Sequence, residues 1–295
     1  MSPLHKTFKM PLPIWVKTRL QEIKNTQNYF KNRKINTVCE TLRCPNRSLC
    51  YKEPTATFMI LGNICTRECA FCNTEKGKPS SLDKSEPKSI AMAVRELRLS
   101  YVVITSTTRD DLFDGGALHF AETVKEIKKF NPNSIVEVLV PDFKGKISSV
   151  ETVVKSEISV FAHNVETVKK LYGVVRKADY IRSLNVLSMA KKINKNIITK
   201  SGLMLGLGET LDEIKETLND LKDVNCDIVT IGQYLQPSKK AMPVVEYKKP
   251  EFFEEIAEIA LSMDFKVVLS APLVRSSTKA YEAYLAVREG RYGKL

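Results

Sequence analysis

Long hydrophobic runs are absent from this sequence of 295 residues. No apolar stretch approaches the roughly 20 residues that a helix needs to cross a bilayer, so we expect no membrane span. Residues 1–13 mix lysine with proline and lack the apolar core of a secretory signal. A mitochondrial presequence would be longer and richer in arginine and serine. Together these absences predict a cytoplasmic protein.

A dense basic tract is also missing, although the chain is basic overall. Lysine and arginine number 46 against 34 aspartates and glutamates, which gives a net charge of +12. The lysines are spread along the sequence, so the charge does not indicate nucleic acid and we expect no such partner. A basic surface attracts acidic proteins by long-range steering. The alternative is a solvated basic surface that has no specific partner.

Histidine is scarce, and none of the three histidines stands near the cysteines. Six of the seven cysteines fall between residues 39 and 72, whereas disulfide scaffolds are small and carry cysteine throughout. The six form two triplets, which are Cys39, Cys44 and Cys50, then Cys65, Cys69 and Cys72. A zinc site that used four of these thiols would leave two without a role. Because a [4Fe–4S] cluster normally takes four thiolates, two triplets suggest two clusters, each with a fourth ligand from elsewhere.

Strand and helix patterns alternate from residue 57 onward. Short apolar or β-branched runs at 57–61, 101–105, 135–140, 158–162, 197–205 and 228–231 are typical of buried parallel strands. Helical periodicity marks intervening segments such as 117–130 and 210–224. This alternation predicts an α/β fold with a parallel sheet, and six units suit a partial (β/α)6 barrel. The isolated Cys226 is expected to be a small buried hydrophobe on a strand.

The expected organisation has three parts. Residues 1–56 form an N-terminal extension with a short helix near 15–27 and the first cysteine triplet, residues 57–235 form the barrel, and residues 236–295 form a C-terminal extension. In such barrels chemistry lies on the loops after the carboxyl ends of the strands. Polar or cysteine-bearing segments follow five predicted strands, at 65–72, 109–116, 141–145, 163–164 and 206–209. These segments are therefore expected to share one rim.

Two motifs carry a resemblance to a known family. Cys65-x3-Cys69-x2-Cys72, with the aromatic Phe71 before its last cysteine, is similar to the signature of the radical S-adenosylmethionine (SAM) superfamily. The upstream Cys39-x4-Cys44-x5-Cys50 resembles the auxiliary-cluster motif of lipoyl synthases. The resemblance runs from about residue 11 to 280 and includes Arg275-Ser276-Ser277. Relatives usually have Tyr where this chain has Thr278, a change expected to alter local packing.

The resemblance implies a radical SAM enzyme that inserts two sulfur atoms, at C6 and C8, into a protein-bound octanoyl-lysine. The second triplet, Cys65, Cys69 and Cys72, would hold the catalytic [4Fe–4S] cluster, whose remaining iron takes SAM. The first triplet would hold an auxiliary [4Fe–4S] cluster, the sulfur donor, with Ser277 as fourth ligand. A hydroxyl is a weaker iron ligand than a thiolate, which suits a cluster that is dismantled. Ser276 is an alternative ligand, and the plainer alternative for either serine is an ordinary loop hydroxyl.

Further cofactor contacts are expected at strand ends, and each has a plainer alternative. The candidates are Phe71, Glu137, Asn164, Arg182 and Glu209. Gly202-x-Met204-x-Gly206-x-x-Glu209 resembles the adenine-binding strand of radical enzymes, although a strand entering a helix cap has the same pattern. Arg182 and Arg275 are candidates for anionic parts of cofactor or substrate, or for surface ion pairs. Glu137 and Asn164 are equally suited to capping loops.

The partners implied by the resemblance are proteins. They are octanoylated lipoyl-carrier domains (of 2-oxoacid dehydrogenase E2 or the glycine cleavage H protein), an electron donor such as flavodoxin or ferredoxin, and an iron–sulfur carrier protein. Acidic carriers would suit the basic surface. The competing hypotheses are a biotin synthase-like or methylthio-transferring radical enzyme and a zinc-stabilised nucleic-acid-binding module. The upstream triplet and Arg275-Ser276-Ser277 argue against the first, and the barrel pattern argues against the second.

Overall fold

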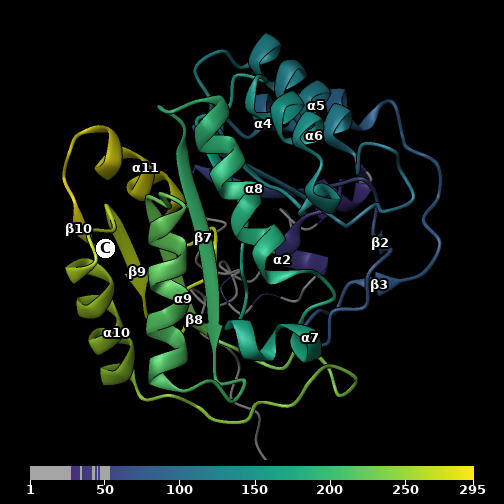
Figure 1. Cartoon of the computed structure of the whole chain (residues 1–295). Helices are drawn as coiled ribbons and strands as arrows, with labels where there is room; N and C mark the ends of the chain where they lie inside the picture. The colour runs from purple at the N-terminus through teal and green to yellow at the C-terminus, as the bar shows by residue number, and fades with distance from the viewer. Residues whose placement is uncertain (1–27, 34, 42–43, 45, 47–53) are drawn as a thin grey trace, which may run out of the picture.

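The computed structural model describes residues 28–33, 35–41, 44, 46 and 54–295. Its centre is one sheet of eight parallel strands in the order β1–β4–β5–β6–β7–β8–β9–β10. The part of this sheet from β7 to β10 is labelled in Figure 1. The strands are β1 (Thr55–Ile60), β4 (Tyr101–Ser106), β5 (Ile135–Leu139), β6 (Val160–Ala162), β7 (Ile198–Leu205), β8 (Ile228–Gln233), β9 (Val267–Ser270) and β10 (Gly293–Lys294). Two further short strands, β2 (Ile64–Cys65) and β3 (Glu75–Lys76), pair with each other outside this sheet.

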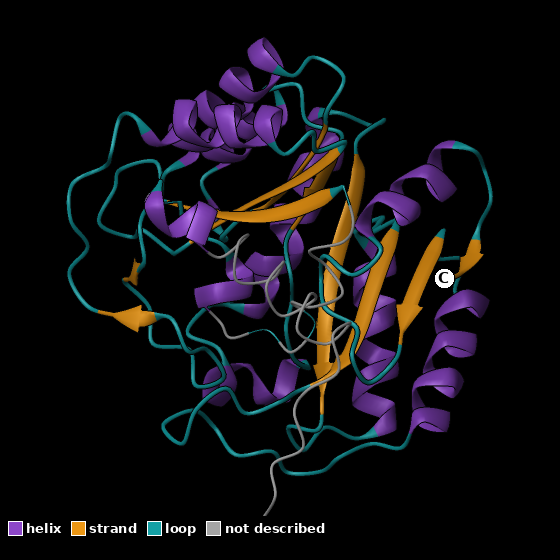
Figure 2. Cartoon of the chain, turned by 180° about the vertical axis from the view of Figure 1, so that it is seen from behind, coloured by secondary structure: helices purple, strands orange, loops and turns teal. Residues whose placement is uncertain are grey.

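Helices pack on the outer face of the sheet because alternate strand residues on that side are apolar. Val102 and Ile104 of β4 are fully buried in the core shared with the helices, whereas Tyr101 and Val103 belong to a separate cluster. The outer helices are α4 (Glu86–Glu96), α5 (Ala117–Phe130), α6 (Ile147–Val154), α8 (Tyr180–Ile193), α9 (Leu211–Asp223) and α10 (Pro250–Ser262). Seen from behind, the strands lie in front of α9 and α10 (Figure 2).

The predicted partial barrel is confirmed, with a sheet longer than expected. All six predicted strands are present, but β9 and β10 extend the sheet, so it has eight strands rather than six. The segment after residue 235 thus continues the barrel through α10, β9, α11 (Ala280–Arg288) and β10. A four-residue β9 and a two-residue β10 are too short to leave a clear periodic signal in the sequence. Strands β1 and β10 form the two edges, so the barrel is open.

Helix α11 closes the inner face at the amino ends of the strands. Its Ala283, Ala286 and Val287 pack in one cluster with the first residues of four strands, which are Val160, Ile198, Ile228 and Val267. Tyr281 and Tyr284 pack against Tyr101, at ring-centroid distances of 5.6 and 6.1 Å. The amino end of the barrel is therefore filled by side chains, which leaves the carboxyl ends for chemistry.

Local signals explain several element boundaries. Helix α9 confirms the helix predicted over 210–224, and Thr210 and Glu213 form a reciprocal capping box at its start. Cys226 is buried as expected, but it lies in the connection before β8 and not on a strand. The helix expected near 15–27 lies outside the described residues. Within the described residues, no helix is long and apolar enough to span a bilayer.

Candidate active site at the carboxyl ends of the strands

The second cysteine triplet lies on one loop that follows β1. Cys65 ends β2, and β3 closes the loop with Cys65 and Lys76 opposite each other in register. The three cysteines are partly buried. A two-stranded sheet at its base therefore holds this loop as a compact unit.

Each sulfur receives a hydrogen bond from a nearby backbone amide. The N–H of Arg67 donates to Cys65 Sγ at 3.4 Å, that of Lys177 to Cys69 Sγ at 3.4 Å, and that of Thr74 to Cys72 Sγ at 3.5 Å. Donors directed at sulfur favour the thiolate, which is the form that binds metal.

The sulfurs are also close enough to influence one another. Burial raises the pKa of the Cys69 thiol, and Cys72 and Cys65 raise it further, whereas the Lys177 amide and Arg176 lower it. Among the described residues, no three Cys, His, Asp or Glu side chains already stand at the spacing of a single bound ion. A four-iron cube binds each sulfur at a separate corner, so it needs wider spacing than one ion does. Three partly buried thiols on one loop, each with an amide donor, are suited to hold a metal centre as thiolates.

Neighbouring rim loops brace the cysteine loop through backbone hydrogen bonds. Thr66 donates its N–H to Thr108 O, after β4, at 3.0 Å. Ala70 donates to Val175 O at 2.9 Å, at the end of the short helix α7 (Tyr172–Val175), and accepts from the N–H of Met242 at 2.8 Å. Loops that are far apart in the sequence thus converge on the cysteine loop, as the fold prediction expected.

An ion-pair network links the same loop to the ends of β4 and β5. Arg67 contacts Asp110 at 2.6 Å and Asp142 at 2.6 Å, and Arg182 contacts Asp142 at 3.5 Å. Asp142 is fully buried, which favours its neutral form, yet Arg67 holds its pKa at about 2. Arg182 therefore lies in a buried charge network at the rim, 38% exposed at its own side chain.

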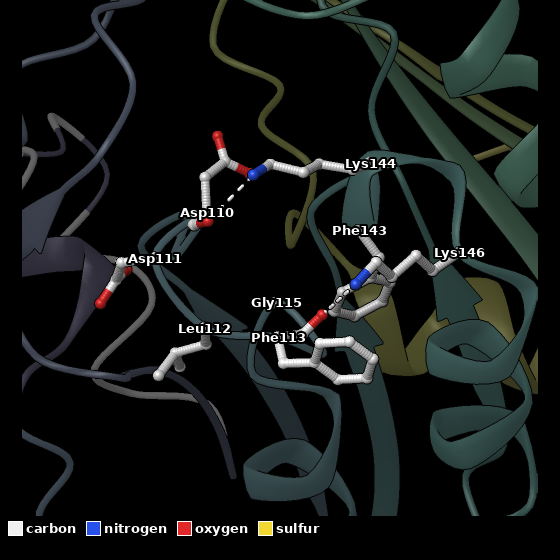
Figure 3. Close-up of a pocket in the computed structure, with 8 residues that line it drawn as sticks. All are labelled: Asp110, Asp111, Leu112, Phe113, Gly115, Phe143, Lys144 and Lys146. Atoms are coloured by element: carbon white, nitrogen blue, oxygen red, sulfur yellow. Dashed lines mark hydrogen bonds between the residues drawn. The ribbon is translucent and has the colours of Figure 1, made fainter.

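A pocket of about 360 Å³ opens beside this network (Figure 3). Its lining is Asp110, Asp111, Leu112, Phe113, Gly115, Phe143, Lys144 and Lys146. Phe113 is 89% exposed, and the Lys146 ammonium lies 3.8 Å from the centroid of its ring. The pocket lies at the loops after β4 and β5, and none of the described cysteines lines it.

Arg176 organises the loop after β6. Its guanidinium donates to the carbonyl of Asn164, to the hydroxyl of Tyr172 at 3.1 Å and to Nε2 of His163 at 3.3 Å. Burial, then the Arg176 charge, lower the pKa of His163 to about 3, so the imidazole is neutral. Its Nδ1 lies 2.7 Å from Val140 O, which fits a proton on Nδ1 and a free acceptor on Nε2. The three acceptors around Arg176 are therefore all uncharged.

Asn164 joins the β6 loop to the serine motif. Its Nδ2 lies 2.6 Å from Ser276 Oγ and 3.1 Å from Glu166 Oε1. Its Oδ1 is buried without a hydrogen-bond partner among the described residues. Gly202 makes room for this amide, since a Cβ there would lie 2.8 Å from Oδ1. A buried acceptor without a donor at the rim is suited to receive a donor from a bound ligand.

Two other residues expected to contact a cofactor, Glu209 and Phe71, lie in different environments. Glu209 is buried and accepts the N–H groups of Gly206 and Leu207 at 2.6 and 2.9 Å, so it shapes the loop after β7. Phe71 packs in an apolar cluster with Val175, Leu207, Tyr234, Met204, Met242 and others. This cluster forms an apolar wall beside the cysteine loop.

Glu137 lies in the middle of β5 and not at a strand end, which corrects its expected position. Its carboxylate contacts the Lys200 ammonium at 2.9 and 3.1 Å and accepts from the Tyr101 hydroxyl at 2.6 Å. Glu137 and Lys200 are each 1% exposed. Both carboxylate oxygens are therefore engaged inside the barrel, in the layer above α11.

The turn that carries the serine motif lies against the barrel and against the segment with Cys44 and Asn46. Gly232 of β8 allows this approach, since a Cβ there would lie 2.1 Å from Val274 O. Thr278 closes the turn: its hydroxyl accepts from the Arg275 N–H at 2.8 Å, and its own N–H donates to Arg275 O at 2.9 Å. The departure at this position thus supplies a side-chain cap to the serine turn.

The first triplet is described only in part, because Cys50 lies outside the described residues. Asn46 donates its side-chain amide to Leu273 O at 2.6 Å. Burial lowers the pKa of Arg275, and nearby Cys44 opposes that effect. Cys39 belongs to the short helix α2 (Val38–Thr41) and, like Cys44, is partly buried. The segment with Cys44 and Asn46 therefore meets the turn that carries Ser276 and Ser277.

Sequence reasoning overlooked Arg67, Asp142 and Arg176 as organisers of this rim. Asp142 had a visible signal, since it is the second residue after the strand predicted at 135–140. Arg67 and Arg176 had none, because their partners come from other loops and only the fold brings them together.

Known proteins are similar to this chain in both fold and sequence. Residues 59–221 match the model of the radical SAM superfamily. Solved structures with related folds include methylornithine synthase (TM-score 0.57, 14% identity, 81% of this chain and 70% of the other). Another is the FeFe-hydrogenase maturase HydG from Carboxydothermus hydrogenoformans (TM-score 0.59, 15% identity, 92% and 70%). The class is therefore that of radical SAM enzymes.

Relatives with similar sequences all come from one family within this class. The lipoyl synthase of Caldicellulosiruptor saccharolyticus is 54% identical over 92% of this chain and 96% of its own. Those of Aquifex aeolicus and Pyrobaculum arsenaticum are each 49% identical, over 94% and 92% of this chain and 100% and 95% of their own. The chain belongs to the lipoyl synthase family.

Proposed function

We propose that this chain inserts two sulfur atoms, at C6 and C8, into an octanoyl group attached to a lysine of a carrier protein. The observation that carries the proposal is the meeting of two cysteine-bearing segments at one rim. The Cys65–Cys72 loop follows β1, and the segment with Cys44 and Asn46 lies on the serine turn. Asn164 donates to Ser276 on the serine turn, and its carbonyl accepts from Arg176, whose neighbour Lys177 donates to Cys69 Sγ on the cysteine loop.

Cys65, Cys69 and Cys72 are the proposed ligands of the catalytic [4Fe–4S] cluster. When bound, this cluster and SAM supply the hydrogen-abstracting chemistry that side chains cannot perform on an aliphatic C–H bond. The protein contributes amide donors to the three sulfurs and the apolar wall that includes Phe71. A wall of this kind excludes water from a reactive centre.

Other residues of the rim are proposed to position SAM. Asn164 offers its unpaired Oδ1 as an acceptor. Glu209 acts through the loop whose amides it holds, and Arg182 through the network around Asp142. Glu137 is not proposed as a contact, because Lys200 and Tyr101 occupy its carboxylate.

Cys39, Cys44 and Cys50 are proposed to hold the auxiliary cluster, which donates the sulfur. Ser277 is the favoured fourth ligand over Ser276, because the Ser276 hydroxyl accepts the hydrogen bond from Asn164. The Thr278 cap keeps the two serines in a tight turn facing the segment with Cys44. A serine oxygen is a harder ligand than thiolate, so this corner would open more readily.

The proposed partners follow from this chemistry. They are octanoylated lipoyl domains or the glycine cleavage H protein, a flavodoxin or ferredoxin as reductant, and an iron–sulfur carrier that rebuilds the auxiliary cluster. The net charge of +12 supports encounters with acidic carriers, and raised salt should slow association.

The test is an anaerobic reaction of reconstituted protein with SAM, a reductant and an octanoyl-lysine peptide, followed by mass spectrometry. The expected product carries two sulfur atoms in place of two hydrogens. Cys65→Ala should give unmodified peptide, whereas Cys226→Ala, at a buried cysteine away from the rim, should retain activity. Transfer of a methylthio group, or no sulfur transfer by fully loaded enzyme, would contradict the proposal.

A further inference from the structure

Lys76 touches the cysteine loop at all three of its cysteine residues. In the β2–β3 pair, its backbone lies opposite Cys65. Its ammonium lies 2.9 Å from the carbonyl oxygen of Cys72 and 3.3 Å from that of Cys69. One side chain thus crosses the loop from its base and binds both remaining cysteines through their main chain.

The two carbonyls form a natural site for a cation. Cys72 donates its N–H to Cys69 O at 3.2 Å, so the chain makes a tight turn between these residues. The turn brings both carbonyl oxygens within reach of one ammonium, which has three donors and no acceptor. Hydrogen bonds from a charged donor are stronger than those between neutral groups. Among the described residues, Lys76 has no carboxylate within ion-pair distance, so these carbonyls are its principal acceptors.

The position of the Lys76 ammonium also affects how readily a cluster at this loop is reduced. A [4Fe–4S] cluster gains a negative charge when it is reduced, and a nearby cation favours that state. Lys76 lies at the peptide groups of two of the proposed ligands, where its charge is fixed by the same two hydrogen bonds.

We propose that Lys76 is a positioning residue that holds Cys65, Cys69 and Cys72 ready for the catalytic cluster and favours the cluster's reduced state. The inference rests on the proposed function, in which these cysteines are the ligands. It assigns Lys76 no contact with the substrate. It predicts that loss of the ammonium loosens the loop and makes the cluster harder to reduce.

Lys78 provides a matched control two residues away. It has the same charge, its side chain is exposed, and no interaction of its ammonium is present among the described residues. Lys76→Met removes the clamp and keeps an unbranched side chain. Lys76→Arg keeps the charge and the ability to donate to both carbonyls.

The experiment uses the full chain with Cys39→Ala, so that the proposed catalytic cluster alone gives the signal. Iron loss to a chelator is followed by absorbance, and the midpoint potential is measured by redox titration with electron paramagnetic resonance. Lys76→Met removes both hydrogen bonds and should lose iron at least about tenfold faster, since tenfold is the factor expected for one of them. Its potential should become more negative. Lys76→Arg should restore both properties in part, and Lys78→Met should match the parent.

Equal iron loss and equal potentials in Lys76→Met and Lys78→Met would overturn the inference. Circular dichroism establishes that each variant is folded, and Lys76→Gln replaces Lys76→Met if the latter does not fold. A separate variant, Cys65→Ala in the same background, tests the ligand assignment. If it retained the full iron content, the proposed function would fail, whatever the result at Lys76.

Discussion

The buried ion pair of Glu137 and Lys200 allows a stringent test of the barrel interior. Both side chains are 1% exposed, and the ammonium lies 2.9 and 3.1 Å from the two carboxylate oxygens. Lys200→Met keeps the length of the side chain and removes the charge. Glu137 would then be left inside the barrel with the Tyr101 hydroxyl as its remaining donor among the described residues.

The expected cost follows from that isolation. Removing one partner of a buried ion pair costs about 3–5 kcal/mol, because the other charge is left uncompensated. For a chain of this length, 1 kcal/mol corresponds to roughly 2 °C in the melting temperature. Lys200→Met should therefore melt about 6–10 °C below the parent, while packing losses remain small.

The assay is thermal and urea unfolding of the cluster-free chain, with an exposed pair as control. Lys155 and Glu151 lie 2.6 Å apart, but their side chains are 68% and 46% exposed. Lys155→Met should cost less than about 1 kcal/mol, since solvent screens the pair. The double variant Glu137→Leu with Lys200→Met should be more stable than Lys200→Met alone, because it buries no charge. If Lys200→Met melted no lower than Lys155→Met, the reasoning would be refuted.

Two other predictions concern the rim. The pKa of His163 is lowered to about 3, so the unfolded chain binds an extra proton below pH 6.5. The stabilisation from neutral His163 is complete above pH 6.5 and is lost as the pH falls toward 3, by about 2 kcal/mol at pH 5. The unfolding free energy of His163→Gln should therefore depend less on pH between pH 5 and 7. A pH dependence equal to that of the parent would contradict this prediction. Gly232→Ala should displace the serine turn from Val274 O and speed trypsin cleavage after Arg275, whereas Gly173→Ala, with open space around it, should not.

The sequence was sufficient for the fold where patterns were long and local. Helix α5 matches its predicted bounds, and α9 begins one residue after the predicted start at Thr210. The shortness of β9 and β10 explains why the sheet was predicted with six strands. The packing of α11 on the inner face of the sheet could not be predicted either. Its small apolar residues indicate that the helix is buried on one side, but not which part of the fold it packs against.

In the site, too, local features could be predicted from the sequence and long-range contacts could not. Cysteine spacing and position after β1 identified the loop with Cys65, because ligand spacing is a property of a short segment. Glu137 was misplaced because a buried carboxylate on a strand has the same local sequence whether it meets a ligand or a lysine from β7. The bond between Asn164 and Ser276 joins residues 112 positions apart, and such pairings emerge only from the tertiary fold.

The most direct test of the central claim is the iron and acid-labile sulfide content per chain after anaerobic reconstitution, with zinc measured alongside. Two [4Fe–4S] clusters predict about eight iron and about eight sulfide. Cys39→Ala and Cys65→Ala should each halve both values, and Cys226→Ala should leave them unchanged. About four iron in the parent, with no further loss in Cys39→Ala, would contradict the auxiliary cluster, and zinc without iron would contradict the whole account.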